Sequence, residues 1–279
     1  MADNKTANGD PRPIGVFDSG IGGLTVVAAL RKILPNESIH YLGDTARVPY
    51  GGKSAATVQR YSSEIAALLL EDDAKAIVVA CNTASALALP MLDEQLPVSV
   101  TGVIAPGAQA AIAATRNGHI GVIGTRATIK SGAYERALRQ LDAGVRVSAR
   151  ACPLLVPLIE EGWLESRVTD QVLTQYLQPL LDDGIDTLVL GCTHYPLLRP
   201  AISRFLGQAV TLVDSAENCA KAVRELLVRQ KLEAAPGSGG TLQVGLTDPP
   251  DAFLEIAHQA LQLELGKVEV RDLAELARR

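Results

Sequence analysis

Two cysteines follow two apolar runs of this chain, and they are the residues best suited to chemistry. Cys81 follows Ile77–Ala80, and Cys192, 111 residues later, follows Thr187–Gly191. Each run predicts a buried strand, and ligands of open α/β sheets bind at the carboxyl ends of the strands. A thiol from each half of the chain therefore predicts acid/base work on two faces of one small substrate.

The chemistry that suits two thiols is the removal and return of a proton on carbon. A hydrogen beside a carboxylate is barely acidic, so its base must be strong and yet deprotonated near neutrality. A thiol has an unperturbed pKa of about 8.5, and nearby donors or a helix N-terminus stabilise its thiolate. A thiolate and a thiol on opposite sides of a substrate would racemise it without a cofactor. The polar residues that follow the two thiols are Asn82, Thr83, Thr193 and His194.

The other cysteines lack such neighbours. We interpret Cys152 and Cys219 as inert core thiols, because free cysteine is among the most buried residue types. No Cys-x-x-Cys spacing occurs, which favours free thiols in a reducing compartment over a zinc site or a disulfide framework. His194 titrates near neutrality and could hold or exchange the proton of Cys192, while the alternative is a histidine that caps a turn.

Polar residues also follow the first expected strand. The segment Asp18–Gly23 reads Asp-Ser-Gly-Ile-Gly-Gly, whose glycines permit close approach of the backbone to a ligand. Its spacing is not that of a dinucleotide-binding loop, and the acidic residue would repel phosphate. Asp18 could contact a substrate ammonium or poise Cys81, with a helix N-cap formed by Asp18 or Ser19 as the alternative.

Two further segments supply candidate residues. Tyr50 and Gly51 lie in an expected turn, Val48–Gly52, after the second strand, where the tyrosine and the backbone amides could hold a carboxylate. Glu160 could supply an acid from the second half of the chain. A solvated helix end is the alternative for Glu160 and its neighbour Glu161.

Composition limits the class of protein. Of 279 residues, 47% are apolar, 20% charged and 4% aromatic, so aliphatic side chains fill the core, as in parallel sheets covered by helices. The net charge of −5 and the lack of a dense basic cluster argue against a nucleic-acid surface. Residues 1–13 lack the apolar region of a secretory signal, which predicts a flexible tail and a cytoplasmic protein. We expect no membrane span.

Apolar runs and helical periods alternate along the chain, which predicts a doubly wound parallel sheet. The expected strands are Ile14–Asp18, Ile39–Leu42, Ile77–Ala80, Val98–Val103, Ile120–Ile123, Val145–Ala151, Thr187–Leu190, Val210–Val213 and Leu242–Thr247. The expected helices are Leu24–Leu34, Thr57–Leu70, a short helix ending at Leu89, Pro106–Thr115, Thr128–Leu141, Val168–Leu181, one from Asp214 to about Gln230, and Pro250–Leu263.

Short motifs recur at similar intervals. Gly15–Asp18 has a counterpart in Gly121–Gly124 at an offset of 106, and Val100–Val103 resembles Val210–Val213 at an offset of 110. Together with the two cysteine segments, these matches predict a duplicated domain. The fold class that follows is α/β, with two similar doubly wound parallel-sheet domains related by pseudo-symmetry and the active site between them.

The motifs resemble those of a known enzyme family. Asp18–Val26, Pro49–Gly51, Ala80–Ser85 and Gly191–Leu197 are similar, in this order, to segments of the cofactor-independent glutamate racemases of bacterial cell-wall synthesis. His194 favours these over the related aspartate racemases, whose second motif usually carries an acidic residue there. The resemblance covers nearly the whole chain.

The resemblance implies interconversion of L- and D-glutamate without pyridoxal phosphate or metal, supplying D-glutamate for peptidoglycan. It makes Cys81 and Cys192 the acid/base catalysts and Asp18, His194 and Glu160 their proton-handling neighbours. It assigns binding of the substrate's carboxylates and ammonium to Asp18, Ser19, Tyr50, Gly51, Asn82, Thr83, Thr193 and His194.

The resemblance also carries expectations about architecture and assembly. Residues 14–105 and 215–279 would form the first domain, and residues 106–214 the second. A homodimer is common in the family, and members with an N-terminal extension can respond to a cell-wall precursor. The polar tail and the loop at residues 235–240 depart from a minimal member, which leaves such regulation open.

Three rival functions remain on the sequence alone. Another two-thiol amino-acid or hydantoin racemase is the nearest, and substrate competition would separate it. The second is a two-lobed ligand-binding protein of the periplasmic type. The sequence shows no export signal, and two thiols at strand ends would have no role in such a protein. A cysteine hydrolase built on Cys192 and His194 would leave Cys81 without a role.

Overall fold

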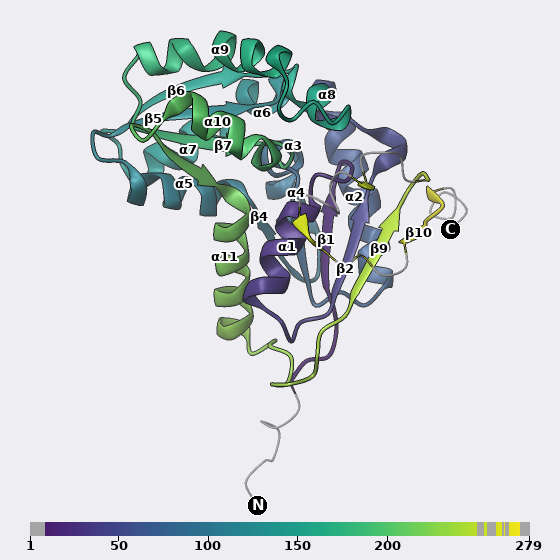
Figure 1. Ribbon diagram of the computed structural model, residues 1–279. Coiled ribbons are helices and arrows are strands. Elements are labelled where there is room, and N and C mark those ends of the chain that lie inside the picture. Colours follow the sequence, from purple (N-terminus) through teal and green to yellow (C-terminus); the bar gives the residue numbers. More distant parts are fainter. Residues whose placement is uncertain (1–8, 250–253, 256–260, 264, 266–267, 274–279) are drawn as a thin grey trace, which may run out of the picture.

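Two parallel sheets, one of six strands and one of four, organise the computed structural model. The structure describes residues 9–249, 254–255, 261–263, 265 and 268–273. Figure 1 shows the six-stranded sheet in the lower lobe, in purple, blue and yellow, and the four-stranded sheet in the teal and green upper lobe. The predicted α/β class with two parallel-sheet units is confirmed.

The first sheet has the strand order β10-β9-β2-β1-β3-β4. Its central strands are continuous apolar runs buried on both faces, as parallel sheets require, because helices cover both sides. The strands are β1 (Ile14–Asp18), β2 (Ile39–Gly43), β3 (Ala76–Val79), β4 (Ser99–Gly102), β9 (Leu242–Leu246) and β10 (Val268–Val270).

The second sheet has the order β6-β5-β7-β8, which repeats the order β2-β1-β3-β4 of the first. Its edge strand β6 carries Arg146 and Arg150, in keeping with the charges that protect sheet edges. Strands β3 and β7 are therefore equivalent, and each delivers one of the two cysteines at its carboxyl end. The strands are β5 (His119–Gly124), β6 (Arg146–Ala151), β7 (Thr187–Gly191) and β8 (Thr211–Asp214).

Several helices begin with capping side chains that satisfy their first free N–H groups. Ser54, Thr125, Ser166 and Asp214 accept hydrogen bonds at the starts of α2, α6, α9 and α11. The helices are α1 (Leu24–Ile33), α2 (Ala55–Glu71), α3 (Asn82–Leu87), α4 (Leu89–Gln95), α5 (Ile104–Ala114), α6 (Arg126–Ser131), α7 (Ala133–Leu141), α8 (Leu155–Glu160), α9 (Arg167–Asp182), α10 (Arg199–Leu206) and α11 (Ser215–Gln230). Short 3-10 turns are η1 (Thr45–Arg47), η2 (Tyr50–Gly52) and η3 (Tyr195–Leu198).

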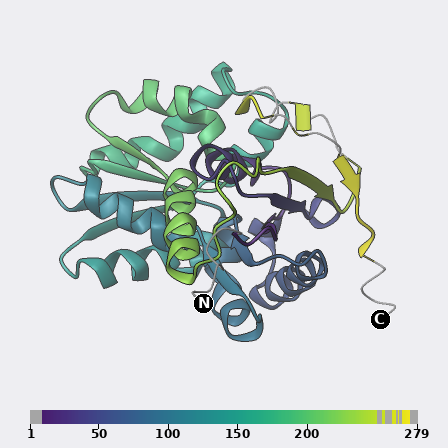
Figure 2. The same cartoon turned by 90° about the horizontal axis from the view of Figure 1, so that it is seen from below.

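The chain returns from the second sheet to the first through α11. This helix descends beside α1 (Figure 1), and both contribute to one core cluster that includes Leu30, Val223 and Leu227. Strand β9 then pairs with β2 along its whole length. Figure 2, seen from below, shows α11 beside the first sheet with β9 and β10 on the far side. The domain boundaries expected from the sequence stay a prediction.

Some predicted elements differ from the structure. The helix expected at Thr128–Leu141 is two helices, because Gly132 has a positive φ of 65° that ends α6 and precedes α7. The short helix expected to end at Leu89 stops at Leu87, and a separate helix, α4, begins at Leu89. The sequence patterns also missed α8, α10 and β10.

Two predictions concern the ends of the chain. Most of the helix expected at Pro250–Leu263 lies outside the described residues, as do residues 1–8 of the expected tail. The described part of the tail makes contacts, since the Asp10 backbone N–H donates to the Glu233 carbonyl at 2.8 Å. Among the described helices, none is long and apolar enough to cross a membrane.

Candidate active site

The two thiols line one pocket between the sheets. Cys81 follows β3 and precedes the first residue of α3, while Cys192 directly follows β7. They are 5% and 6% exposed, so the pocket shields both from bulk water. The residues that line it are Ser19, Val48, Pro49, Tyr50, Gly51, Cys81, Asn82, Thr83, Thr125, Val156, Cys192, Thr193 and His194.

Cys81 lies beside the loop that follows β1. Its Sγ donates to Ser19 Oγ at 3.6 Å. Burial and the nearby Asp18 carboxylate raise the pKa of Cys81 to about 12, although the N–H of Ala84 at the start of α3 acts in the opposite direction. In the unliganded pocket this thiol therefore holds its proton.

Asp18 is completely buried at the end of β1. One carboxylate oxygen accepts a hydrogen bond from the Gly23 N–H at 2.9 Å, and the other from Thr193 Oγ1 at 3.5 Å. Burial raises the pKa of Asp18, and the charge of His194 opposes that shift. No side-chain hydrogen bond caps α1, whose N-cap residue is Gly23, so neither Asp18 nor Ser19 is the N-cap. Asp18 instead accepts a hydrogen bond from the Gly23 N–H, immediately before the helix.

Cys192 has a basic neighbour instead. Its Sγ lies 3.9 Å from His194 Nδ1, and His194 Nε2 lies 3.2 Å from Glu160 Oε1 at the end of α8. Burial lowers the pKa of His194, but the contacts with Cys192 and Glu160 outweigh it and raise this pKa to about 10. At neutral pH the side chain beside Cys192 is therefore an imidazolium.

The predicted binding residues gather around the thiols. Ser19, Asn82, Thr83 and Thr193 are each at most 8% exposed and line the pocket. The pocket lining that the structure describes contains no lysine or arginine. An anionic ligand would therefore be held by neutral hydroxyl, amide and backbone donors, whose fixed dipoles can stabilise a carboxylate.

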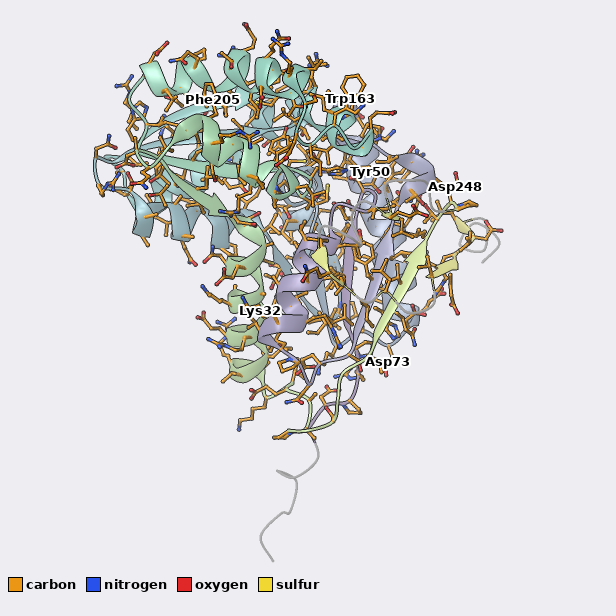
Figure 3. All side chains as sticks on the ribbon, in the orientation of Figure 1. Lys32, Tyr50, Asp73, Trp163, Phe205 and Asp248 are labelled. Carbon is orange, nitrogen blue, oxygen red and sulfur yellow. The ribbon has the colours of Figure 1, made fainter. Side chains whose placement is uncertain are left out.

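Tyr50 departs from the donor role expected for it. Figure 3 labels Tyr50 near the junction of the two lobes, and its ring lines the pocket. Its hydroxyl, however, donates to Asp44, which Arg47 also binds. Because that proton is engaged, a hydrogen bond from this turn to a ligand would come from backbone N–H groups, including that of Gly51.

Sequence reasoning missed two threonines of the second half. Thr125 Oγ1 lies 2.9 Å from Thr83 Oγ1 and 3.0 Å from Thr128 Oγ1, which joins hydroxyls of α3 and α6 across the lobes. The repeat offset of 106 contained the signal, because it places Thr125 opposite Ser19 just as it places Gly124 opposite Asp18. Of the predicted site residues, Asp18 and Glu160 lie outside the pocket lining and contact Thr193 and His194, and the others line the pocket together with Thr125. Their roles stay a prediction.

The chain is similar to known proteins along most of its length. Residues 24–223 match the family model described as Asp/Glu/Hydantoin racemase. A glutamate racemase from Geobacter metallireducens is 50% identical over 257 residues, covering 92% of this chain and 95% of the relative.

Solved structures give similar matches. The glutamate racemase of Francisella tularensis in complex with D-glutamate has a TM-score of 0.88 and 39% identity, covering 95% of this chain and 99% of that one. The glutamate racemase of Escherichia coli, in complex with L-glutamate and the activator UDP-MurNAc-Ala, has a TM-score of 0.76 and 30% identity, covering 94% and 99%.

Proposed function

The chain belongs to the Asp/Glu/hydantoin racemase family, and we propose that it interconverts L- and D-glutamate by passing the Cα proton between Cys81 and Cys192. It is an amino-acid racemase, and its relatives and structural neighbours include the glutamate racemases of Geobacter metallireducens and Francisella tularensis. The observation that carries the mechanism is the pair of buried thiols at equivalent strand ends, β3 and β7, in one pocket.

The two thiols have different neighbours. Burial and the Asp18 carboxylate raise the pKa of Cys81, so it keeps its proton, whereas Cys192 Sγ lies 3.9 Å from His194 Nδ1. Cys192 is therefore the base that we propose for the first step. For one enantiomer, the Cys192 thiolate takes the Cα proton, and the electron pair of the C–H bond moves into the α-carboxylate. Cys81 then gives its proton to the opposite face, which inverts the centre and leaves the thiol and thiolate exchanged.

The opposite enantiomer requires the exchanged state, in which Cys81 is the base. Asp18 would hold the substrate ammonium, and the proton would return between turnovers through groups such as His194 and Glu160. Glu160 is suited to this because its side chain is 35% exposed, whereas that of His194 is 4% exposed. The neutral donors of the pocket would stabilise the charge that develops on the α-carboxylate.

The test of this function is circular dichroism of L-glutamate and of D-glutamate, each incubated with the purified enzyme in D2O without added cofactor. Both signals should decay to zero while deuterium appears at Cα. Aspartate and a hydantoin serve as competing substrates. If they react and glutamate does not, the proposed substrate is wrong; if none of the three reacts, the proposed racemisation of glutamate is wrong.

We also propose that the enzyme supplies D-glutamate for peptidoglycan synthesis. The support is the similarity to the Escherichia coli enzyme, whose structure holds a cell-wall precursor as activator. Rescue of a bacterium that requires D-glutamate would test the supply.

Activation by a cell-wall precursor and a homodimer stay predictions. Adding UDP-MurNAc-Ala to the activity assay would test the first, and analytical sedimentation of the purified protein would test the second.

A further inference from the structure

Tyr134, a buried residue of α7, contacts the site from behind the pocket wall. Its hydroxyl donates to Asn82 Oδ1 at 2.7 Å, and Tyr134 and Asn82 are 3% and 2% exposed. The described lining of the pocket includes Asn82 but not Tyr134. This contact joins the second half of the chain to the residue that directly follows Cys81.

The amide of Asn82 has only one of its two ends satisfied. Oδ1 accepts from Tyr134, while Nδ2 is buried and has no hydrogen-bond partner among the described residues. An unsatisfied buried donor is costly, and native proteins keep one mainly where a ligand or an ordered water completes it. In a pocket that takes a carboxylate, a free N–H donor is what the ligand requires.

The ring of Tyr134 packs closely against two glycines, where a side chain would crowd it. A Cβ on Gly191, the residue before Cys192, would lie 3.1 Å from Tyr134 Cε2, and one on Gly107 of α5 would lie 3.5 Å from its hydroxyl. The Cβ of Ser215, at the start of α11, would lie 3.3 Å from that same position on Gly107. The phenol is thus fixed where α5 and α11 connect the two lobes.

We propose that Tyr134 is a positioning residue for substrate binding: by donating to Asn82 Oδ1, it orients the Asn82 amide so that Nδ2 is presented to a carboxylate of the substrate. This inference rests on the proposed function, because it takes glutamate as the ligand. Without the phenol proton, the amide could rotate by half a turn. Its oxygen would then face the carboxylate and repel it.

Tyr134→Phe tests the inference, since it keeps the ring and removes only the hydroxyl. KM should rise about tenfold for both L- and D-glutamate, the scale of one lost hydrogen bond, while kcat changes by less than about threefold. The two enantiomers have equal free energy in water, so kcat/KM must fall equally in both directions. Tyr176→Phe, which removes a phenol hydroxyl from α9, should leave both constants unchanged.

A double-mutant cycle separates positioning from a general effect on folding. Asn82→Ala alone should raise KM, and adding Tyr134→Phe should raise it no further, because the group to be positioned is gone. Equal effects of Tyr134→Phe in the two backgrounds would overturn the inference, as would an unchanged KM in the single variant. Thermal unfolding of each variant checks that the folded state is retained.

The outcomes also distinguish this inference from the proposed function. If the wild-type enzyme does not racemise glutamate, both are wrong. If the wild type racemises glutamate and Tyr134→Phe does so with the same KM, the function stands and only the positioning role of Tyr134 is overturned.

Discussion

Cys81 and Cys192 differ in their surroundings although their strands are equivalent. Cys81 faces an acid and a hydroxyl, Asp18 and Ser19, whereas Cys192 faces an imidazole that Glu160 supports. One thiol thus lies beside a carboxylate and the other beside an imidazole. In the proposed mechanism, this asymmetry would supply an acid and a base from two equivalent strand ends.

Removal of either thiol should stop turnover in both directions, because one abstracts the proton and the other returns it. For Cys81→Ala and for Cys192→Ala we expect kcat to fall at least about 10³-fold from either enantiomer. Polarimetry measures the activity, and thermal unfolding measures retention of the fold. Cys219→Ala, in the core of α11, is the matched control and should keep wild-type kcat. Near-wild-type turnover by either site variant contradicts the mechanism.

His194 should make the free energy of unfolding depend on pH. Its pKa in the folded state, about 10, lies above the ordinary 6.5, so the folded state binds its proton more tightly than the unfolded chain does. The stability from this histidine is fully present below pH 6.5 and is lost as the pH rises to about 10.

The comparison is between the wild type and His194→Gln in urea unfolding across this range. The difference in unfolding free energy should be largest below pH 6.5 and should shrink toward pH 10. His40→Gln, near the amino end of β2, should not reproduce this trend. A pH-independent difference for His194→Gln would show that the imidazolium is not stabilised as described.

At the scale of elements, the sequence predicted the strands with clear apolar runs and the polar residues that follow them. The continuous apolar runs of β1, β3 and β7 and the polar residues after them were predictable because parallel strands place their carboxyl ends at one sheet edge. Short helices were not. α8 and α10 have six and eight residues and each contains a proline, so they show little helical period.

Side-chain direction was the other limit. Tyr50 lines the pocket, but the direction of its hydroxyl depends on Asp44, which the turn pattern does not reveal. The contact of Tyr134 with Asn82 joins residues 52 positions apart, and no motif links them. Thr125 could have been predicted only by applying the repeat offset of 106 to Ser19, the residue after the matched motif.

The break between α6 and α7 is a testable feature of this element scale. Gly132 has φ 65°, a conformation that costs a residue with a Cβ about 1 kcal/mol. Gly132→Ala should lower the free energy of unfolding by about that amount, as measured in urea. Gly52→Ala is the control, because φ is not positive there and its Cβ would meet nothing within 4 Å. No loss in Gly132→Ala would contradict the assignment of the break to this backbone conformation.

At the scale of the whole molecule, a buried ion pair joins four segments that are distant in the sequence. Lys75 Nζ lies 2.6 Å from Glu37 Oε2 and donates to the Asp10 carbonyl at 2.8 Å. Glu37 Oε1 accepts from the Ala234 N–H at 2.7 Å. The side chains of Lys75 and Glu37 are 0% and 3% exposed, so this pair fixes the segment before β1, at Asp10, and the segment before β9 at the end of the first sheet opposite the site.

Breaking this pair should destabilise the fold without changing the chemistry. Lys75→Met leaves the Glu37 carboxylate buried and unpaired, which should cost about 3–5 kcal/mol of unfolding free energy. The double variant Lys75→Met/Glu37→Gln removes that charge and keeps an acceptor for Ala234, so it should be more stable than the single variant. Equal stability of Lys75→Met and the wild type would contradict the role of the pair.

The most direct test of the central claim follows deuterium during the first turnovers of L-glutamate in D2O. Two thiols on opposite faces predict that the D-glutamate formed carries deuterium at Cα while the remaining L-glutamate keeps its protium, with the mirror result from D-glutamate. Mass spectrometry of the separated enantiomers measures both pools. Deuterium entering the recovered substrate as fast as the product would show that one base serves both faces, and the two-thiol account would be wrong.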